Sequence, residues 1–384
     1  MQQHLMRAGF VGVATLTALA GVALPGYAAP PPPSLIYVSP TGGVSGDNSS
    51  CAQASQSSIQ TAVDLITTGG TVVVCAGTYQ ESVTVSQRLT LKGDGAPVID
   101  ATGHTFGISL GADYVTVDGF VVQNAQVDTE NENSIPGDGI VTAALTEGGP
   151  VVANFATIIN NVARNNDGNG IDVESSHGAV VSNNRSGKNG VGINVVADFG
   201  PAYDNVISNN VANRNGGGCG IVLADHSGAG VYSNEVSGNT ANWNGLDSPV
   251  APNASSGSGI ILATPAPNGM VKDNRVVNNM FRGNGHAGIA LHAHTSGADF
   301  SGNYLAYNNI SRNNTHYDYK DKHTTGIYLG SVDPLKIRAV RNYIHGNYYG
   351  IFMAGDITVK GRSTNTMVNV THRYGSTPTY PSFG

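Results

Sequence analysis

The chain has 384 residues, of which only 12% are charged, and its formal net charge is -7. It contains no block of basic residues, which excludes an ordinary nucleic-acid-binding protein and argues against nucleic acid as a partner. Its 51 glycines are well above the average share of roughly 7%, so a chain rich in turns is expected.

The N-terminus has the pattern of an export signal. Arg7 precedes an apolar run from Ala8 to Leu24, and Gly26-Tyr27-Ala28 places small residues at the two positions that determine cleavage. We expect residues 1–28 to be a signal peptide and residues 29–34 a Pro-rich leader. The mature protein is then secreted or periplasmic and has no membrane span.

The three cysteines fit an oxidising compartment. Cys51 lies in a loop rich in Ser and Asn, and Cys75 ends a run of valines that is typical of a strand. We expect these two residues to form a disulfide. Cys219 lies beside a later strand and is expected to be a small packed residue.

The first elements are predicted to be a strand, a helix and then several short strands. In the segment Ser58–Ile66, the apolar residues fall on one helical face, and Ser57 or Ser58 is the expected N-cap. An amphipathic helix at this place would cover the end of a stack of strands. Strands are expected at Leu35–Ser39, Thr71–Val74, Ser82–Val85, Leu89–Leu91 and Val98–Ile99, with turns at 77–79 and 92–95.

From residue 107 onward the chain repeats a Gly-Ile step at intervals of 22 to 39 residues. Most of these steps follow segments rich in Asn, such as Ile207-Ser208-Asn209-Asn210. Short β-branched runs with turns of Asn and Gly, and no helical period, indicate a solenoid of stacked parallel strands. The glycines of the steps are Gly107, Gly139, Gly170, Gly192, Gly220, Gly259, Gly288, Gly326 and Gly350.

Each Gly-Ile-x-Val/Leu segment is a short strand with alternate residues facing inward. Stacked coils turn the inward Ile, Val and Leu residues into continuous interior rows. The turns require positive φ angles, which Gly and Asn tolerate best. A buried Asn at a turn can also bond to the Asn of the next coil, so that the residues form a ladder.

The segments Ile36–Ser39, Ser58–Val63, Thr71–Tyr79 and Leu89–Gly93 resemble the entry of right-handed parallel β-helix proteins of the pectate-lyase-like superfamily. This group includes periplasmic β-helix proteins of nitrous-oxide reductase maturation. The resemblance covers roughly residues 35–360. It implies an architecture and leaves the chemistry open, because this fold carries lyases, hydrolases, esterases, epimerases and non-enzymes.

The expected fold class is therefore all-β, a right-handed single-stranded parallel β-helix solenoid with a short N-terminal capping helix. We expect residues 35–100 to form the cap and first coils, 101–356 the repeats, and 357–384 a C-terminal strand and tail. Three inserts lengthen the repeat, at Gln126–Asp138, Leu246–Ser258 and Arg312–Thr325. They form either one binding face or three solvated loops.

Aligning the Gly-Ile strands predicts which residues point away from the interior. Polar members cluster on consecutive coils, where neighbouring strands are close enough for side chains to share a ligand. We expect the catalytic residues to be Asp172, Glu174, Asp225 and His226. Asp198 and Asp225 are the candidate metal ligands, with Ca²⁺ as the candidate cofactor. The candidate substrate-binding residues are Asn194, Arg185, Lys188, His292, His294 and Tyr328.

None of the catalytic motifs of pectin methylesterases, polygalacturonases or pectate lyases is intact in this sequence. Asp225-His226 shares only the last two residues of one pectate-lyase run. We expect a monomeric protein that acts on or binds an extracellular polysaccharide, as a lyase or epimerase of a uronate-containing glycan. The alternative is a non-catalytic glycan-binding, envelope structural or periplasmic maturation module, in which the same charges serve solubility and turns.

Overall fold

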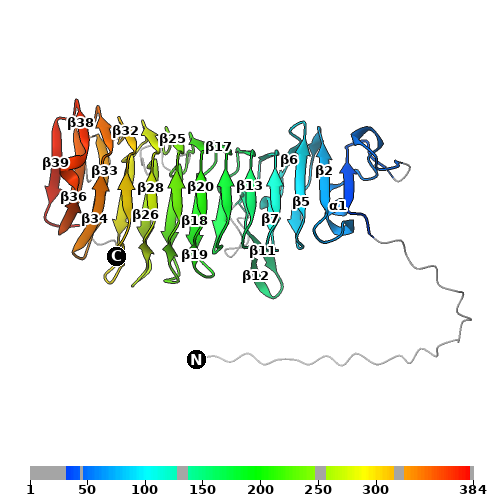
Figure 1. Cartoon of the computed structure of the whole chain (residues 1–384), viewed down its shortest axis with the longest axis horizontal. Helices are drawn as coiled ribbons and strands as arrows, with labels where there is room; N and C mark the ends of the chain where they lie inside the picture. The colour runs from blue at the N-terminus through cyan, green and yellow to red at the C-terminus, as the bar shows by residue number, and fades with distance from the viewer. Residues whose placement is uncertain (1–31, 44–45, 128–136, 247–256, 315–323, 381–384) are drawn as a thin grey trace, which may run out of the picture. The chain divides into compact units, whose positions relative to one another are not determined.

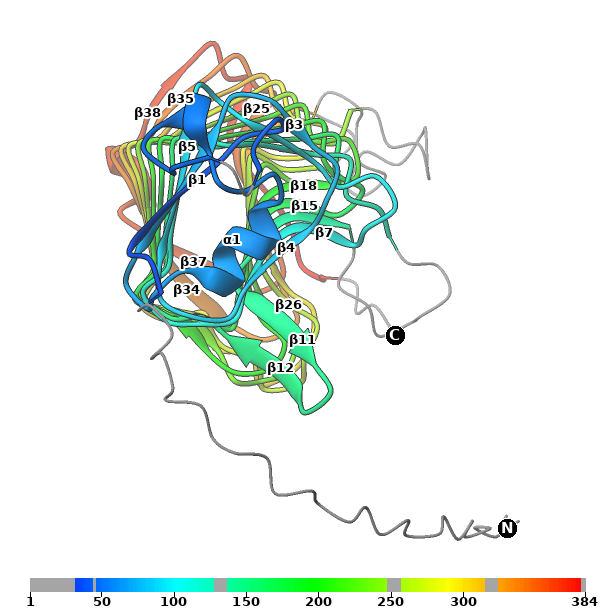
Figure 2. The same cartoon turned by 90° about the vertical axis from the view of Figure 1, so that its right-hand side faces the viewer.

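The computed structural model describes residues 32–43, 46–127, 137–246, 257–314 and 324–380, and its elements belong to the unit Pro33–Gly384. In this unit the chain winds through three sheets, and each turn of the winding, called a coil here, adds a strand to each sheet (Figure 1). The three sheets face different sides of the coil, as the view in Figure 2 shows. The predicted signal peptide and most of the three predicted inserts lie outside the described residues.

The strands of sheet A pair in parallel, each with the equivalent strand of the next coil. Within the described residues sheet A has 12 strands. They are β1 (Leu35–Val38), β2 (Thr71–Cys75), β5 (Thr90–Asp94), β8 (Thr116–Asp118), β13 (Thr157–Ile159), β16 (Val180–Ser182), β20 (Val206–Ser208), β24 (Glu235–Ser237), β28 (Arg275–Val277), β31 (Tyr304–Ala306), β34 (Leu335–Val340) and β37 (Ile357–Lys360).

Sheet B follows sheet A in each coil and has 11 strands within the described residues. They are β3 (Thr78–Tyr79), β6 (Val98–Asp100), β9 (Val121–Gln123), β14 (Val162–Arg164), β17 (Arg185–Gly187), β21 (Val211–Asn213), β25 (Thr240–Asn242), β29 (Met280–Arg282), β32 (Asn309–Ser311), β35 (Tyr343–His345) and β38 (Thr366–Val368).

Sheet C contains the Gly-Ile strands and also has 11 strands within the described residues. They are β4 (Val83–Val85), β7 (Phe106–Leu110), β10 (Asp138–Val141), β15 (Asn169–Glu174), β18 (Val191–Ala197), β22 (Ile221–Asp225), β26 (Ile260–Thr264), β30 (Ile289–Ala293), β33 (Thr325–Ser331), β36 (Tyr349–Ala354) and β39 (His372–Thr377).

Shorter elements complete the fold. The antiparallel pair β11 (Ala143–Thr146) and β12 (Gly149–Val152) forms a hairpin that projects from the stack (Figure 2). A small parallel sheet holds β19 (Ala202–Tyr203), β23 (Val231–Tyr232) and β27 (Val271–Lys272). Two 3₁₀ turns lie at η1 (Cys51–Gln53) and η2 (Arg362–Thr364). No helix of the described residues has the length and apolar character that crossing a membrane requires.

The helix α1 (Ile59–Leu65) covers the first coil, as predicted, and buries Ile59, Ala62 and Val63. Ser58 is the N-cap, and its hydroxyl accepts a hydrogen bond from the backbone N–H of Thr61. The carboxylate of Glu81 accepts further bonds from the first backbone N–H groups of the helix, at 2.9 and 3.1 Å. A negative charge at a helix N-terminus is stabilising.

The predicted disulfide between Cys51 and Cys75 is confirmed, and Cys219 is a buried free thiol. A link that closes a loop of this length stabilises the fold by about 3 kcal/mol in the chain-entropy model. Two predicted turns are wrong. Thr78–Tyr79 is strand β3, and β5 extends to Asp94 because its last residues pair with Val74 and Cys75 of β2.

The predicted register of sheet C is confirmed. The outward position runs through Asp172, Asn194, Val222, Ile261, Ala290, Tyr328 and Phe352 on successive strands. The inward Ile and Val or Leu positions are fully buried in the one large apolar core of the described residues. The predicted C-terminal strand is present as β37, and β38 and β39 follow it and complete a further coil up to Thr377.

The predicted Asn ladders are present at three turn positions within the described residues. In each, the side-chain amide of one Asn donates to the side-chain oxygen of the next, mostly at about 3.0 Å. The backbone N–H of the same residue donates to that oxygen too. Every rung is buried, so the ladders satisfy polar groups that water cannot reach.

Candidate functional site

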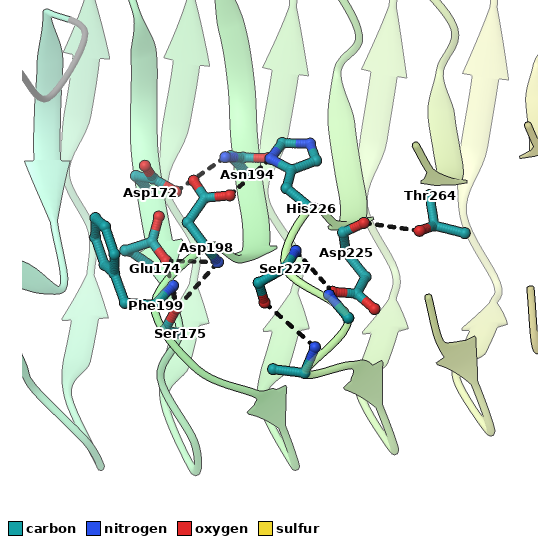
Figure 3. A network of polar contacts seen from close by, with 12 residues as sticks. Asp172, Glu174, Ser175, Asn194, Asp198, Phe199, Asp225, His226, Ser227 and Thr264 are labelled. Carbon is teal, nitrogen blue, oxygen red and sulfur yellow. Dashed lines mark hydrogen bonds and ion pairs between the residues drawn. The ribbon is translucent and has the colours of Figure 1, made fainter. Parts of the chain in front are cut away.

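Polar side chains that the sequence places on separate coils meet where strands β15, β18 and β22 of sheet C end. Figure 3 shows Asp172 and Glu174 from β15, Asn194 and Asp198 from β18 and the loop after it, and His226 after β22. The parallel register brings Asp172 beside Asn194. The structure therefore groups these five predicted site residues.

Asp172 and Asp138 lie side by side in the buried part of the site. The carboxylate of Asp172 accepts hydrogen bonds from the amides of Asn194 at 3.0 Å and Asn169 at 3.2 Å. Asp138 accepts a bond from the backbone N–H of Asn169 at 2.6 Å. Its Oδ2 atom is buried and has no hydrogen-bond partner, which is consistent with the raised pKa of this carboxyl group.

Glu174 lies on the same outward face and is 4% exposed. Its Oε1 accepts a hydrogen bond from the hydroxyl of Ser175 and one from the backbone N–H of Asp198 at 3.2 Å. The Ser175 oxygen in turn accepts bonds from the backbone N–H groups of Asp198, Phe199 and Gly200. Ser175 thus links the carboxyl group of Glu174 to the loop after β18, and this loop carries Asp198.

Burial raises the pKa of each of these carboxyl groups. Loss of water raises the pKa of Glu174 to about 9, and the charge of Asp172 adds to the shift. Burial likewise raises the pKa of Asp138 to about 7, and it raises the pKa of Asp172 well above the usual value, with the charge of Asp138 contributing. Near neutral pH, Glu174 therefore carries a proton that it can donate.

Asp198 and His226 form an accessible ion pair at the edge of the same group. The Nδ1 of His226 lies 2.7 Å from the Oδ1 of Asp198, and the two side chains are 47% and 37% exposed. The hydrogen bond that His226 donates to Asp198 raises the pKa of His226 above its usual value, although burial opposes the shift. Burial raises the pKa of Asp198, but bonds from His226 and Glu174 outweigh it, so its pKa is lowered.

The group thus combines carboxyl groups that keep a proton with an ionised carboxylate that orients an imidazole. When Nδ1 of His226 donates to Asp198, the Nε2 atom is free to take a proton from a ligand. Glu174, with a pKa of about 9, is the candidate acid, and His226, held by Asp198, is the candidate base. The arrangement can move protons to and from a bound substrate.

Asp225 does not join this group, contrary to the prediction. It pairs in register with the inward residue Ala197, and its side chain is fully buried. Its carboxylate accepts hydrogen bonds from the backbone N–H groups of Ser227, Gly228 and Met270, at 3.2, 2.8 and 2.7 Å. Asp225 shapes the turn after β22.

The predicted Ca²⁺ ligands Asp198 and Asp225 therefore do not face one another. Asp198 pairs with His226, and the oxygens of Asp225 are occupied by backbone N–H groups. No set of three or more His, Cys, Asp or Glu residues in the described part of the chain is placed to hold a metal ion. The donor set at this position does not fit a Ca²⁺ ion, which takes six to eight oxygen ligands.

The other predicted substrate-binding residues lie elsewhere. His292 and His294 are at β30, where both imidazoles lie 3.1 Å from the hydroxyl of Tyr380. Tyr328 is 2% exposed and stacks on Phe352, so its ring is not available to a sugar. Arg185 and Lys188 belong to sheet B and its turn, which face a different side of the coil from the Asp172 group (Figure 2).

Two residues of the site, Asp138 and Ser175, escaped the sequence analysis. Asp138 was predicted to be the last residue of the first insert. Asp138 lies two residues before Ile140, and Asn169 lies two residues before Ile171 in the next coil, so the two residues occupy equivalent positions. The Gly-Ile spacing therefore contains the signal that places Asp138 on sheet C. Ser175 has a positive φ of 48°, which no sequence pattern marked.

Comparison with known proteins shows which proteins share this fold. Residues 113–263 match the family model of the right-handed β-helix region. No curated protein matched the sequence. Pectate lyase Pel9A has a similar structure, with a TM-score of 0.52 and 16% identity over 86% of this chain and 78% of the lyase.

Two further solved structures are similar in fold. PfbA, a surface adhesin of Streptococcus pneumoniae, has a TM-score of 0.54 and 15% identity, covering 88% of this chain and 91% of the adhesin. The GH136 lacto-N-biosidase of Eubacterium ramulus has a TM-score of 0.51 and 12% identity, covering 90% of this chain and 68% of the enzyme. Identities this low establish a common fold and no common chemistry.

The direction of winding follows from the same evidence. The matched region is named for its right-handed turn, and parallel strands joined by crossovers are right-handed in nearly all proteins. The strand order of the three sheets continues unchanged on both sides of that region. Within the described residues the chain is therefore a right-handed parallel β-helix.

Proposed function

We propose that the protein acts on an extracellular polysaccharide by acid–base chemistry at the group formed by Asp172, Glu174, Asp198 and His226. The observation that carries the proposal is the accessible Asp198–His226 pair beside carboxyl groups whose pKa is raised by burial. The names of the similar structures, a pectate lyase and a lacto-N-biosidase among them, support a glycan as the ligand. The Cys51–Cys75 disulfide supports an oxidising compartment outside the cytoplasm.

Within this class we propose a lyase or epimerase of a uronate-containing chain. The imidazole of His226 takes the proton next to the uronate carboxyl group, and Glu174, whose pKa is raised by burial, supplies a proton. In a lyase the electron pair forms a double bond as the glycosidic oxygen departs and takes up the proton of Glu174. In an epimerase the proton of Glu174 is delivered to the same carbon from the opposite face.

A second candidate function is a non-catalytic glycan-binding module. The burial of Asp172 and Glu174, each 4% exposed, favours it, because groups this enclosed often serve the fold alone. The similarity to a surface adhesin also fits this alternative. Turnover distinguishes the two, because a binding module retains a polysaccharide without changing it.

The test is incubation of the purified protein with a panel of uronate polymers, with and without Ca²⁺. Unsaturated chain ends report lyase activity, and nuclear magnetic resonance of the polymer reports epimerisation. We expect product with the wild type and a loss of at least about 100-fold in His226→Gln. Asp356→Asn, a change at an exposed carboxylate near the end of β36, is the matched control and should retain activity. Wild type that binds a polymer without altering it would favour the binding module.

A further inference from the structure

Sheet B carries a cluster of positive side chains that the acid–base site does not use. Arg164, Arg185, Lys188 and Arg214 lie on strands β14, β17 and β21 and in the turns that follow them. They line a shallow depression of about 320 Å³ on three consecutive coils. All four side chains are exposed. We call these four residues the basic strip.

No carboxylate of the described residues forms an ion pair with the basic strip. Within the described residues, the ion pairs are His226 with Asp198 and Lys272 with Asp299, and neither involves the strip. Arg164 donates a hydrogen bond to the neutral amide of Gln123 at 3.1 Å. Four like charges in a chain whose net charge is -7 repel one another and attract an anion.

The backbone of the strip is held in a conformation that long side chains rarely adopt. Lys188 and Arg214 have φ angles of 60° and 58° in equivalent turns of adjacent coils. The same turn has positive φ throughout, at Asn165 one coil earlier and at Trp243, Gly283 and Arg312 further along. It therefore places Lys188 and Arg214 at equivalent positions of adjacent coils.

The arrangement fits an extended polyanion. The cations are distributed over coils that are spaced about 4.8 Å apart, so they form a line along the solenoid axis. Half-buried Val162 and Val211 lie between them and offer apolar contact to the faces of sugar rings. Guanidinium groups bind carboxylates through paired hydrogen bonds.

A single-stranded nucleic acid is less well matched to this surface. Such ligands require aromatic rings on which bases stack. Trp243, the one tryptophan of the sequence, follows the strip in the same turn column, but the guanidinium of Arg214 covers its ring at 5.5 Å. Its ring edge packs closely on Gly283 of the next coil. The pI near 5.8 also argues against nucleic acid.

We propose that the basic strip is a second binding site, separate from the acid–base site, for a chain of an acidic polysaccharide that carries carboxylate groups. The strip holds the polymer on sheet B while the group at the end of sheet C acts on it or on another part of it. The class of ligand rests on the proposed function, whereas the existence of an anion-binding strip rests on sheet B alone.

Trp243 provides a reporter for this site, because it is unique in the chain and its ring contacts Arg214. The experiment titrates oligogalacturonate into the full chain and follows tryptophan fluorescence at low and high salt. The test variant combines Arg164→Gln, Arg185→Gln and Lys188→Asn, which leaves Arg214 in place. The control variant combines Lys92→Gln, Lys336→Gln and Lys360→Gln, three exposed lysines of sheet A that carry the same total charge.

We expect a saturable fluorescence change in the wild type that weakens with salt. The strip variant should bind at least about tenfold more weakly, and the sheet A control should stay within about twofold of the wild type. Equal weakening in both variants would overturn the proposal, because net charge alone would then explain binding. Equal binding of a neutral oligosaccharide or of single-stranded DNA would overturn it as well.

The outcome is separable from that of the proposed function. If the wild type binds oligogalacturonate at the strip but converts no polymer, the acid–base proposal fails and the strip stands. Both proposals hold under two results together. The His226→Gln variant loses turnover, and the strip variant converts short oligomers but shows no binding by Trp243 fluorescence. Turnover without any charge-dependent binding at Trp243 would remove the strip alone.

Discussion

At the scale of single residues, the environment decides what each carboxyl group does. Asp172 and Asp198 are on neighbouring coils, but Asp172 is 4% exposed and its pKa is raised, whereas Asp198 is accessible and its pKa is lowered. The difference arises from desolvation at Asp172 and from the imidazole partner at Asp198. The carboxylate of Asp225 accepts hydrogen bonds from three backbone N–H groups, and it reaches His226 only through its charge, which helps to raise the pKa of that residue.

The ion pair makes a prediction for His226. Because Asp198 raises the pKa of His226, the change Asp198→Asn should lower that pKa toward the ordinary value of 6.5. Nuclear magnetic resonance of the imidazole protons during a pH titration measures it. His345, whose pKa is lowered by burial and by nearby arginines, serves as an internal control and should not move. An unchanged pKa of His226 would mean that the pair does not form in solution.

At the scale of elements, glycine and asparagine each have a defined place in the coil. The glycines of the Gly-Ile steps face the interior, where a Cβ would meet the carbonyl oxygen of the next coil, at 2.3 Å for Gly192. In an Asn-Asn pair the first residue, such as Asn209, takes a positive φ of 56°. The second residue, such as Asn210, forms the buried ladder. The two asparagines therefore have different reasons to be present.

This division predicts different effects of neighbouring substitutions. Asn239 accepts from the amide of Asn210 and donates to Asn279 and to the carbonyl of Ile207. Asn239→Ala leaves these buried groups without partners and should lower the free energy of unfolding by at least about 3 kcal/mol. The control Asn209→Gly keeps the positive φ and should change it by less than about 1 kcal/mol. Chemical denaturation measures both, and equal losses would refute the ladder's role.

The elements also show what the sequence can predict. The outward column of sheet C followed from a period of two and a repeated Gly-Ile step, both local signals. We expected Lys188 at the acid–base site, but it lies in a turn of sheet B. Sequence spacing does not say which of the three sheets a turn adjoins. Asp225 was expected at the acid–base site because it directly precedes His226. Adjacent residues of a strand point to opposite faces, and Asp225 points inward. His294 is too distant for the site because β26 separates its strand from β22.

At the scale of the whole molecule, the protonated carboxyls link stability to pH. The folded pKa of Glu174, about 9, lies above its ordinary value of 4.5, so the unfolded state loses this proton first. The stabilising effect of the protonated form is complete below about 4.5 and is lost as the pH rises toward about 9. Asp138, with a pKa of about 7, acts in the same direction.

The free energy of unfolding should therefore fall as the pH rises across this window. The change Glu174→Gln keeps the size of the side chain and removes its titration, so the fall should become shallower. Denaturation curves at several pH values between about 4.5 and about 9 measure the effect. Glu235→Gln, a change on sheet A, is the matched control and should leave the slope unaltered. If the free energy of unfolding depends on pH equally in the wild type and in Glu174→Gln, then Glu174 is charged in the folded protein and the prediction is wrong.

The central claim is that Glu174 supplies a proton while His226 accepts one, and the pH profile of polymer conversion tests it most directly. Conversion should rise with pH above 6.5, as His226 loses its proton, and should fall near 9, as Glu174 loses its own. Asp198→Asn should move the rising limb to lower pH, and Glu174→Gln should remove the falling limb together with most of the activity. A profile whose two limbs are the same in both variants and the wild type would contradict the assignment.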